Sequence, residues 1–211
     1  SEYRKVEYEG LYRLCKQAFE KIGYSGADAD TIVDVLLMSD LMGIESHGVQ
    51  RLSMYMSGMD MGRINKNANI KVVKETPVSA VLDGDDGMGQ IVGKQAMEMA
   101  IRKAKAVGMG YVVVRNSCHY GIAGYYSDMA AQEGLFGMSM TNTEALVVPT
   151  FGRTPMLGTN PIAVSMPASP TIFHLDMATS VVPAGKLEVY NKINKPTPEG
   201  WIVSEEGKST T

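Results

Sequence analysis

Two of the three histidines in this 211-residue chain lie in short polar segments beside a glycine. His47 stands in Ser46-His47-Gly48, and His119 stands in Asn116-Ser117-Cys118-His119-Tyr120-Gly121. Imidazole is the side chain best suited to transfer a proton near neutral pH, and loops held by rigid elements often carry catalytic groups. Each histidine is therefore a candidate acid or base, although a lone loop histidine more often has a structural, hydrogen-bonding role.

Cys118 directly precedes His119, which raises the alternative of a thiol nucleophile. A nucleophile and its base must converge in space, and sequence neighbours seldom do so. The only other cysteine is Cys15, so the chain has neither a disulfide framework nor the paired ligands of a zinc site. We therefore expect no metal centre, and we disfavour a cysteine hydrolase.

The chain before His47 has the periodicity of two helices. Apolar residues recur at spacings of three and four over residues 7–22, and Gly23 follows as a stop. Ser25-Gly26-Ala27-Asp28 resembles a capping box that opens a second helix over residues 26–42. These two segments predict a helical beginning.

The chain after His47 predicts a third helix, which begins near Val49. Arg51 and Tyr55 are four residues apart, so they share a helix face that points towards His47. Asp28, Asp30, Asp34 and Asp128 also fall on helices, and we interpret them as solvated faces.

The periodicity changes from helical to strand-like near Ile70. Helices and strands alternate beyond it, which predicts an α/β domain over residues 69–211 after a helical N-terminal domain over residues 1–68. Predicted strands cover residues 70–73, 78–82, 111–114, 135–141, 162–166 and 171–175, and predicted helices cover 94–107, 122–132 and 184–193. Residues 204–211 form a polar tail, after which we expect further chain.

Three glycines, Gly87, Gly89 and Gly93, lie between a predicted strand and helix, where a dinucleotide fingerprint would lie. The spacing is not the usual one, and the acidic residues before it would repel a pyrophosphate at the helix N-terminus. A plain glycine-rich turn is the favoured interpretation.

Two later loops have ligand-binding composition. The segment Gly158-Thr159-Asn160-Pro161 offers close backbone approach and fixed polar groups, and it could equally form a tight turn. The segment from His174 to Ser180 ends a strand, and its polar residues either cap the next helix or meet a ligand there.

Composition excludes several classes of function. The net charge is −3, and lysines and arginines are scattered, so nucleic acid and anionic membranes are poor partners. No apolar run approaches the roughly 20 residues of a membrane span, and residues 1–5 lack a signal peptide's apolar core. We expect a cytoplasmic protein.

Four motifs occur together in the order of one family: Ser46-His47-Gly48-Val49-Gln50-Arg51, Asn116 to Gly121, Gly158 to Pro161 and Leu175 to Ser180. The chain resembles the type 2 malate/L-lactate dehydrogenases, which include ureidoglycolate and sulfolactate dehydrogenases and 2,3-diketo-L-gulonate reductase. The resemblance implies an NAD(P)-dependent oxidoreductase with a helical domain, a non-Rossmann α/β cofactor domain and a homodimer that shapes the active site. Chains of this family continue well beyond a motif like Pro198-Glu199-Gly200-Trp201.

The resemblance also assigns roles. His47 and His119 match catalytic histidines, and Ser46, Arg51 and Tyr55 match substrate-binding positions. Cofactor-binding positions, for NAD or NADP, are Thr143, Asn160, His174, Leu175, Asp176, Met177 and Ala178.

The implied reaction is hydride transfer from C2 of a small 2-hydroxy acid, most simply malate, to the nicotinamide. A histidine accepts the hydroxyl proton and an arginine pairs with the carboxylate. We favour His47 as the acid/base, because Arg51 and Tyr55 would hold substrate near it. The alternatives are ureidoglycolate oxidation, reduction of another 2-oxo acid (pyruvate, sulfopyruvate or diketogulonate), and a catalytically silent scaffold or fragment.

Overall fold

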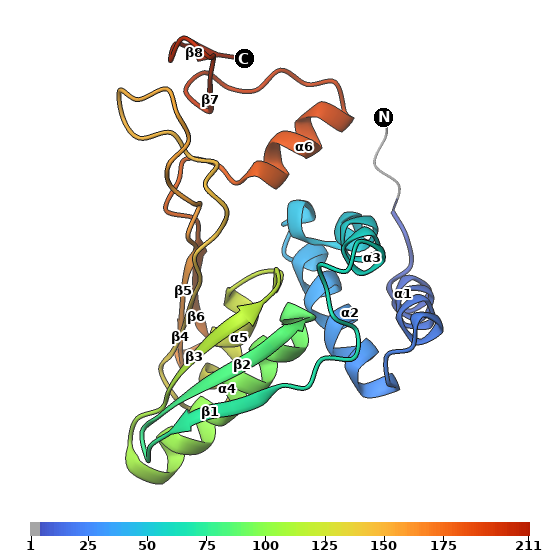
Figure 1. The fold of residues 1–211 in the computed structure, drawn as a ribbon, viewed down its shortest axis with the longest axis vertical. Coiled ribbons are helices and arrows are strands. Elements are labelled where there is room, and N and C mark those ends of the chain that lie inside the picture. Colours follow the sequence, from blue (N-terminus) through green and yellow to red (C-terminus); the bar gives the residue numbers. More distant parts are fainter. Residues whose placement is uncertain (1–4) are drawn as a thin grey trace.

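The computed structural model describes residues 5–211 of the chain, so the first four residues of the segment inspected for a signal peptide lie outside it. The N-terminal part is helical and lies to one side of the sheets (Figure 1). It contains three α-helices and two single 3-10 turns, in the order α1 (Tyr8–Ile22), α2 (Gly26–Leu41), η1 (Glu45–His47), η2 (Val49–Arg51) and α3 (Leu52–Asp60).

The helix boundaries follow the predicted caps, with one correction. Gly23 ends α1 in the left-handed region at φ 115°, and the Ser25 hydroxyl accepts the Asp28 amide, which confirms the predicted stop and cap. The third α-helix begins at Leu52 and not near Val49. The Asp40 carboxylate binds the Val49 amide at 2.8 Å, and this tertiary contact accompanies the tighter 3-10 turn.

The helices bury one common apolar core. Phe19 of α1, Ile32 and Leu36 of α2 and Tyr55 of α3 are all fully buried in it. Burying each aliphatic or aromatic side chain contributes roughly 1.5–3 kcal/mol. This core fixes α3, and with it the position of the Tyr55 phenol.

The first sheet has the order β1-β2-β3, with β1 antiparallel and β3 parallel to β2. The helix α4 connects β2 to β3 and packs on the sheet, as Figure 1 shows. The bounds are β1 (Lys71–Glu75), β2 (Ser79–Gly87), α4 (Gly89–Val107) and β3 (Tyr111–Ser117).

The glycine-rich segment is not the predicted turn. Residues up to Gly87 continue β2, with an irregular register after Asp83, and α4 begins at Gly89 instead of Lys94. A Cβ atom on Gly89 would lie 2.3 Å from the Cys118 carbonyl oxygen. Gly89 therefore serves the close approach of α4 to the loop that carries His119.

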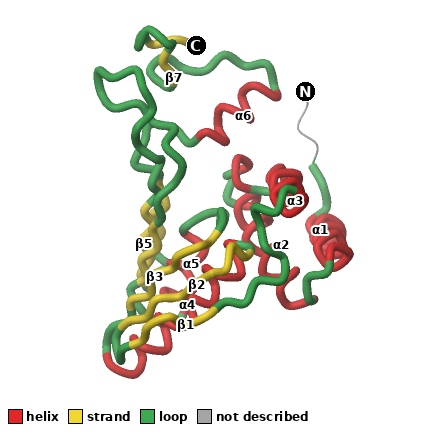
Figure 2. The backbone as a smooth tube through the Cα atoms, in the orientation of Figure 1, coloured by secondary structure: helices red, strands yellow, loops and turns green. Residues whose placement is uncertain are grey.

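The second sheet is antiparallel, with the order β4-β5-β6, and α5 packs against it. Figure 2 shows these strands side by side in yellow, at the opposite side of the molecule from α1. The bounds are α5 (Gly124–Gln132), β4 (Gly137–Met140), β5 (Ile162–Met166), β6 (Phe173–Met177) and α6 (Ala184–Lys192). The predicted polar tail instead pairs in part, since β8 (Ser209–Thr210) lies antiparallel to β7 (Ile202–Val203).

The α/β class is confirmed, with both helices and sheets in the expected order. Neither three-stranded sheet within residues 5–211 is all-parallel. The non-Rossmann character of the cofactor domain and the division at residues 68 and 69 remain predictions. Among the described residues, no helix is long and apolar enough to cross a membrane, and no group of three or more acidic, histidine or cysteine residues could hold a metal ion.

Candidate active site

The two histidines meet in space. The rings of His47, from η1, and His119, from the loop between β3 and α5, are stacked with centroids 5.4 Å apart and an interplanar angle of 23°. Their proximity joins the helical part to the first sheet. The structure thus brings together the two residues that the sequence analysis selected separately.

The corner that carries His47 is fixed by backbone contacts. The Ser39 hydroxyl donates to the Ile44 carbonyl at 2.8 Å, and the Asp40 carboxylate accepts from the Val49 amide. A Cβ atom on Gly48 would lie 1.9 Å from Asp40 Oδ1. The glycine after His47 is therefore required for this corner to close on α2.

His119 is held through its Nδ1 atom. The Tyr55 hydroxyl lies 2.7 Å from Nδ1, and the Gly121 amide donates to the same atom at 3.3 Å. An amide N–H can only donate, so Nδ1 is an acceptor and the Tyr55 hydroxyl donates to it as well. The neutral ring then carries its proton on Nε2, so in this tautomer Nε2 can donate a proton but cannot accept one.

His47 and Arg51 form a separate set of contacts. The Ser46 hydroxyl lies 2.9 Å from His47 Nδ1, and Arg51 Nε donates to the Ser46 carbonyl at 2.7 Å. Arg51 Nη1 also pairs with Glu188 of α6 at 3.0 Å. Arg51 therefore faces Ser46 and α6, whereas Tyr55 faces His119. Both residues thus lie near the histidine pair, as predicted, although Arg51 belongs to a 3-10 turn and not to the predicted third helix.

The surroundings favour neutral imidazoles. Burial, and then the Arg51 charge, lowers the pKa of His47 to about 4. Burial, then His47 and Arg51, lowers the pKa of His119 towards about 3, but the residue is exposed at the pocket, where solvent screens these interactions and weakens the shift. Burial raises the pKa of Tyr55, so its hydroxyl stays protonated as a donor.

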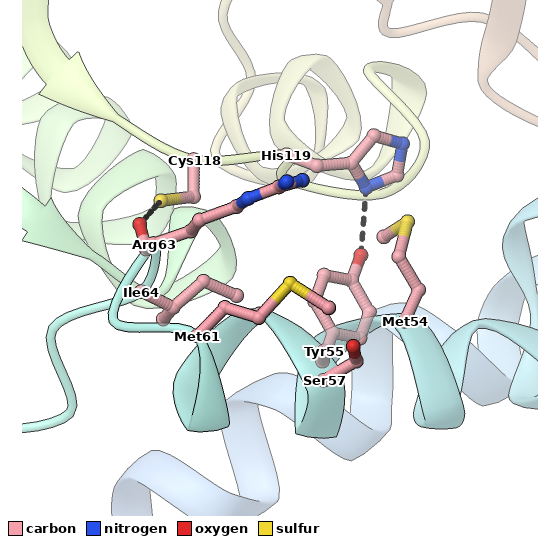
Figure 3. A pocket seen from close by; sticks show the side chains of 9 residues that line it. Met54, Tyr55, Ser57, Met61, Arg63, Ile64, Cys118 and His119 are labelled. Carbon is pink, nitrogen blue, oxygen red and sulfur yellow. Dashed lines mark hydrogen bonds between the residues drawn. The ribbon is translucent and has the colours of Figure 1, made fainter.

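A pocket of about 340 Å³ opens beside His119 and Tyr55 (Figure 3). The volume suits a small organic acid, and the lining is mainly apolar. His47 and Arg51 do not line it. The lining residues are Met54, Tyr55, Ser57, Gly58, Met61, Arg63, Ile64, Cys118 and His119.

Cys118 is engaged within the fold. Its thiol donates to the carbonyls of Arg63 and Asp86 at 3.4 and 3.3 Å, and burial raises its pKa. A protonated, hydrogen-bonded thiol is a poor nucleophile. These contacts argue against the cysteine hydrolase alternative.

Sequence reasoning missed three residues around the site. Arg63 lines the pocket, and Glu188 pairs with Arg51 from a distant helix. Gln90 is fully buried and lies close enough to the Tyr55 phenol to offset part of the rise in its pKa, although neither polar side-chain atom of Gln90 makes a hydrogen bond of standard geometry. The spacing of these residues carries no pattern that would have selected them; only the position of Gln90 between two of the noted glycines drew attention to its segment.

Two of the predicted cofactor positions form one cluster between β4 and β5. The Thr143 amide donates to Asn160 Oδ1 at 3.1 Å, and the Thr159 amide donates to Thr143 Oγ1 at 2.8 Å. A Cβ atom on Gly158 would lie 2.5 Å from Thr143 Oγ1, so this loop packs as tightly as a turn.

The β6 positions differ from their predicted surroundings. Asp176 lies within β6, and its carboxylate accepts the Gly124 amide at 2.7 Å, so it binds the start of α5 and not the next helix. His174 Nδ1 lies 2.8 Å from Asp128, which also accepts from Ser165 at 2.6 Å. Leu175 and Met177 are exposed, and Ala178 is half-buried just after the strand.

Three aspartates are not the solvated residues that we predicted. Asp128 binds His174 and Ser165, because α5 packs against the sheet that carries them. Asp30 and Asp34 both accept from the Tyr12 hydroxyl, and Asp30 also pairs with Lys16 at 2.7 Å, because α1 and α2 lie side by side.

The donor set fits a nicotinamide cofactor. β6 is an edge strand among the described residues, so backbone groups along its outer side are available to a ligand. The Thr143 hydroxyl and the Asn160 amide lie in one cluster beyond the end of this sheet at which β6 finishes, because Ile162 pairs with Met177. Asp176 connects this sheet to α5, whose start lies five residues after His119.

Comparison with known proteins gives the same class. The sequence model of the malate/L-lactate dehydrogenase family matches residues 6–211. A malate dehydrogenase of Pyrococcus horikoshii is 51% identical over 99% of this chain, and an L-sulfolactate dehydrogenase of Methanocaldococcus jannaschii is 46% identical over 96% of it. The crystal structure of a malate dehydrogenase from Entamoeba histolytica, 40% identical, matches 99% of this chain and 58% of that one with a TM-score of 0.95.

The sequence and the fold are therefore those of a dehydrogenase family. The chain belongs to the malate/L-lactate dehydrogenase family, as the sequence motifs predicted. It spans 58% and 59% of the length of the two sequence relatives named above.

Proposed function

We propose that the protein is an NAD(P)-dependent oxidoreductase that transfers a hydride between the nicotinamide and a small 2-hydroxy acid, with malate and oxaloacetate as the leading pair. The observation that carries this proposal is the Tyr55–His119 hydrogen bond at the wall of the small pocket. It places a positioned imidazole where a substrate of this size can bind. The identity to relatives named malate dehydrogenase supports the choice of acid.

The roles follow from the geometry. A bound nicotinamide supplies or accepts the hydride at the substrate carbon. In the reduction direction the Nε2–H of His119 donates its proton to the C2 oxygen while the Tyr55 hydroxyl passes its proton to Nδ1, and the oxidation direction returns both protons. Because Tyr55 binds His119 and His47 does not line the pocket, we assign the acid/base role to His119, and we give His47 a positioning role through ring stacking.

The proposal includes the remaining positions. Ser46 and Arg51 organise the substrate side through His47, and Thr143, Asn160 and the β6 residues from His174 to Ala178 bind NAD or NADP. It also includes a homodimer, a cytoplasmic location and the two domains divided after residue 68.

The test is the oxidation of NADH and of NADPH by the full-length protein with oxaloacetate, pyruvate, sulfopyruvate and diketogulonate. We expect turnover with oxaloacetate and a preference for one of the two cofactors. Turnover with none of these acids by a folded protein would contradict the proposal and favour ureidoglycolate oxidation or a silent scaffold.

One observation favours a second candidate. The relative at 46% identity is named L-sulfolactate dehydrogenase, and its substrate carries a sulfonate where malate carries its second carboxylate. A higher kcat/KM with sulfopyruvate than with oxaloacetate would select this candidate.

A further inference from the structure

The pocket contains one fixed positive charge. Its walls are mainly apolar, with Met54, Met61 and Ile64 among them, and Arg63 is the lining residue with a permanently charged side chain. Figure 3 shows the Arg63 side chain extending along the pocket in the direction of His119.

The backbone of Arg63 is anchored on both sides. Its amide donates to the Gly58 carbonyl at 2.8 Å, and its carbonyl accepts from the Cys118 thiol at 3.4 Å. The guanidinium therefore projects from a fixed point between α3 and the His119 loop. An anchored start lowers the conformational entropy that a binding arginine loses.

The two arginines near the histidines differ in their partners. Arg51 already contacts the Ser46 carbonyl and the Glu188 carboxylate. Within residues 5–211, the Arg63 guanidinium has neither a hydrogen bond nor an ion pair. It is thus the guanidinium at this pocket that can accept a new anionic partner in its two-pronged geometry.

We propose that Arg63 binds the second acidic group of the substrate and so selects 2-oxo acids with two acidic groups over those with one. This inference rests on the proposed function. The acid group nearest C2 stays close to His119, and the intervening methylene lies against the apolar walls. An ion pair beside apolar side chains is less screened than one in water, which strengthens discrimination.

The test compares Arg63→Gln and Arg63→Lys with the unaltered full-length protein, using oxaloacetate and 2-oxobutyrate, which has the same chain length and no second carboxylate. We expect kcat/KM for oxaloacetate to fall about 10- to 100-fold in the glutamine variant, since a charge-assisted contact is lost. The value for 2-oxobutyrate should stay within about twofold, and the lysine variant should recover part of the loss.

The control is Arg13→Gln, which removes an exposed positive charge on α1 away from the pocket. It should leave the ratio of the two kcat/KM values unchanged. Equal losses for both acids in Arg63→Gln, or no loss with either, would overturn the inference.

A binding measurement separates this inference from the proposed function. Calorimetric titration with L-malate and with 2-hydroxybutyrate requires no turnover. Malate affinity should fall at least about tenfold in Arg63→Gln while 2-hydroxybutyrate affinity does not change. If the unaltered protein turns over no acid, the proposed function fails alone. If malate binds both proteins equally or neither, the role of Arg63 fails.

Discussion

His119 combines a fixed tautomer with a depressed basicity. Two donors, the Tyr55 hydroxyl and the Gly121 amide, converge on Nδ1 and keep the ring proton on Nε2. The surroundings lower the pKa of both stacked imidazoles. The free protein therefore presents two neutral imidazoles over the whole range in which an ordinary histidine titrates.

This state predicts an unusual pH profile for the reduction of a 2-oxo acid. The dependence of kcat/KM on pH reports groups of the free enzyme, and here the pKa values are about 4 and about 3. We expect kcat/KM for oxaloacetate reduction to stay nearly constant from about pH 8 down to about pH 5.5, because neither imidazole changes its protonation state in this interval. A half-maximal loss near the ordinary histidine pKa of about 6.5 would contradict the account.

Residue types alone predicted part of the site. His47 and His119 stood out because imidazole beside glycine in polar loops is a pattern that chemistry uses. The partners of these rings could not be predicted, since Tyr55 meets His119 only after α3 packs under the loop that follows β3. Arg63 could not be predicted as a site residue, because no sequence pattern surrounds it and only the folded chain places it in the wall of the pocket.

The helix α6 completes the His47 corner at the level of elements. Glu188 pairs with Arg51, and Lys192 donates to the Gln50 side chain at 2.9 Å. Gly185 permits the close approach, since a Cβ atom there would lie 2.2 Å from Arg51 Nη2 and 3.0 Å from the Ser46 carbonyl.

We therefore expect Gly185→Ala to displace α6 from the corner and to raise KM for the oxo acid about three- to tenfold, with a loss of stability of about 1–2 kcal/mol. Steady-state kinetics and thermal unfolding measure both effects. The matched control is Gly26→Ala, where the new Cβ has 3.4 Å to its nearest neighbour, Glu20 Oε1. If the Gly185→Ala protein has the same KM and the same thermal stability as this control, α6 does not shape the site.

Element types were predictable and element ends were less so. The helices α1 and α2 end where capping residues stand, because caps are local. The segment from Asp83 to Gly93 was predicted as a turn, because its glycines look the same in sequence whether they serve a loop or close packing. The contact of Gly89 with the Cys118 carbonyl, which joins distant segments, settles the matter in favour of packing.

The whole molecule should lose stability in mild acid through His47. The folded state lowers its pKa to about 4, against about 6.5 for an ordinary histidine, so between these values the unfolded chain binds more protons. Protonation of His47 therefore leaves the free energy of unfolding unchanged above about pH 6.5 and lowers it as the pH falls from there towards 4. The free energy of unfolding can fall by at most about 1.4 kcal/mol per pH unit through this one group. The actual fall is smaller, because solvent reaches part of the His47 ring.

Denaturant unfolding at about pH 7 and about pH 5 measures this loss. His47→Gln should lose less stability than the unaltered protein over the same interval. Half-buried carboxyls with raised pKa values act in the opposite direction, but they are common to both proteins and cancel in the difference; they are Asp34, Asp40 and Asp176. Identical losses in the two proteins would refute the role of His47.

At the scale of the molecule, the alternation of periodicities sufficed to predict the α/β class. The arrangement of the strands in two separate sheets could not be predicted, because strand pairing depends on contacts between distant segments. The partner of β2 is the more distant β3 as well as the adjacent β1.

The central claim is that His119, held by Tyr55, exchanges the substrate proton. The most direct test is kcat for oxaloacetate reduction in His119→Gln, with His47→Gln beside it and cofactor binding measured on both as a check of folding. We predict that His119→Gln lowers kcat about 100-fold or more, as expected for a lost general acid, and that His47→Gln lowers it less. A His119→Gln protein that is folded, binds cofactor and keeps more than about a tenth of kcat would contradict the account.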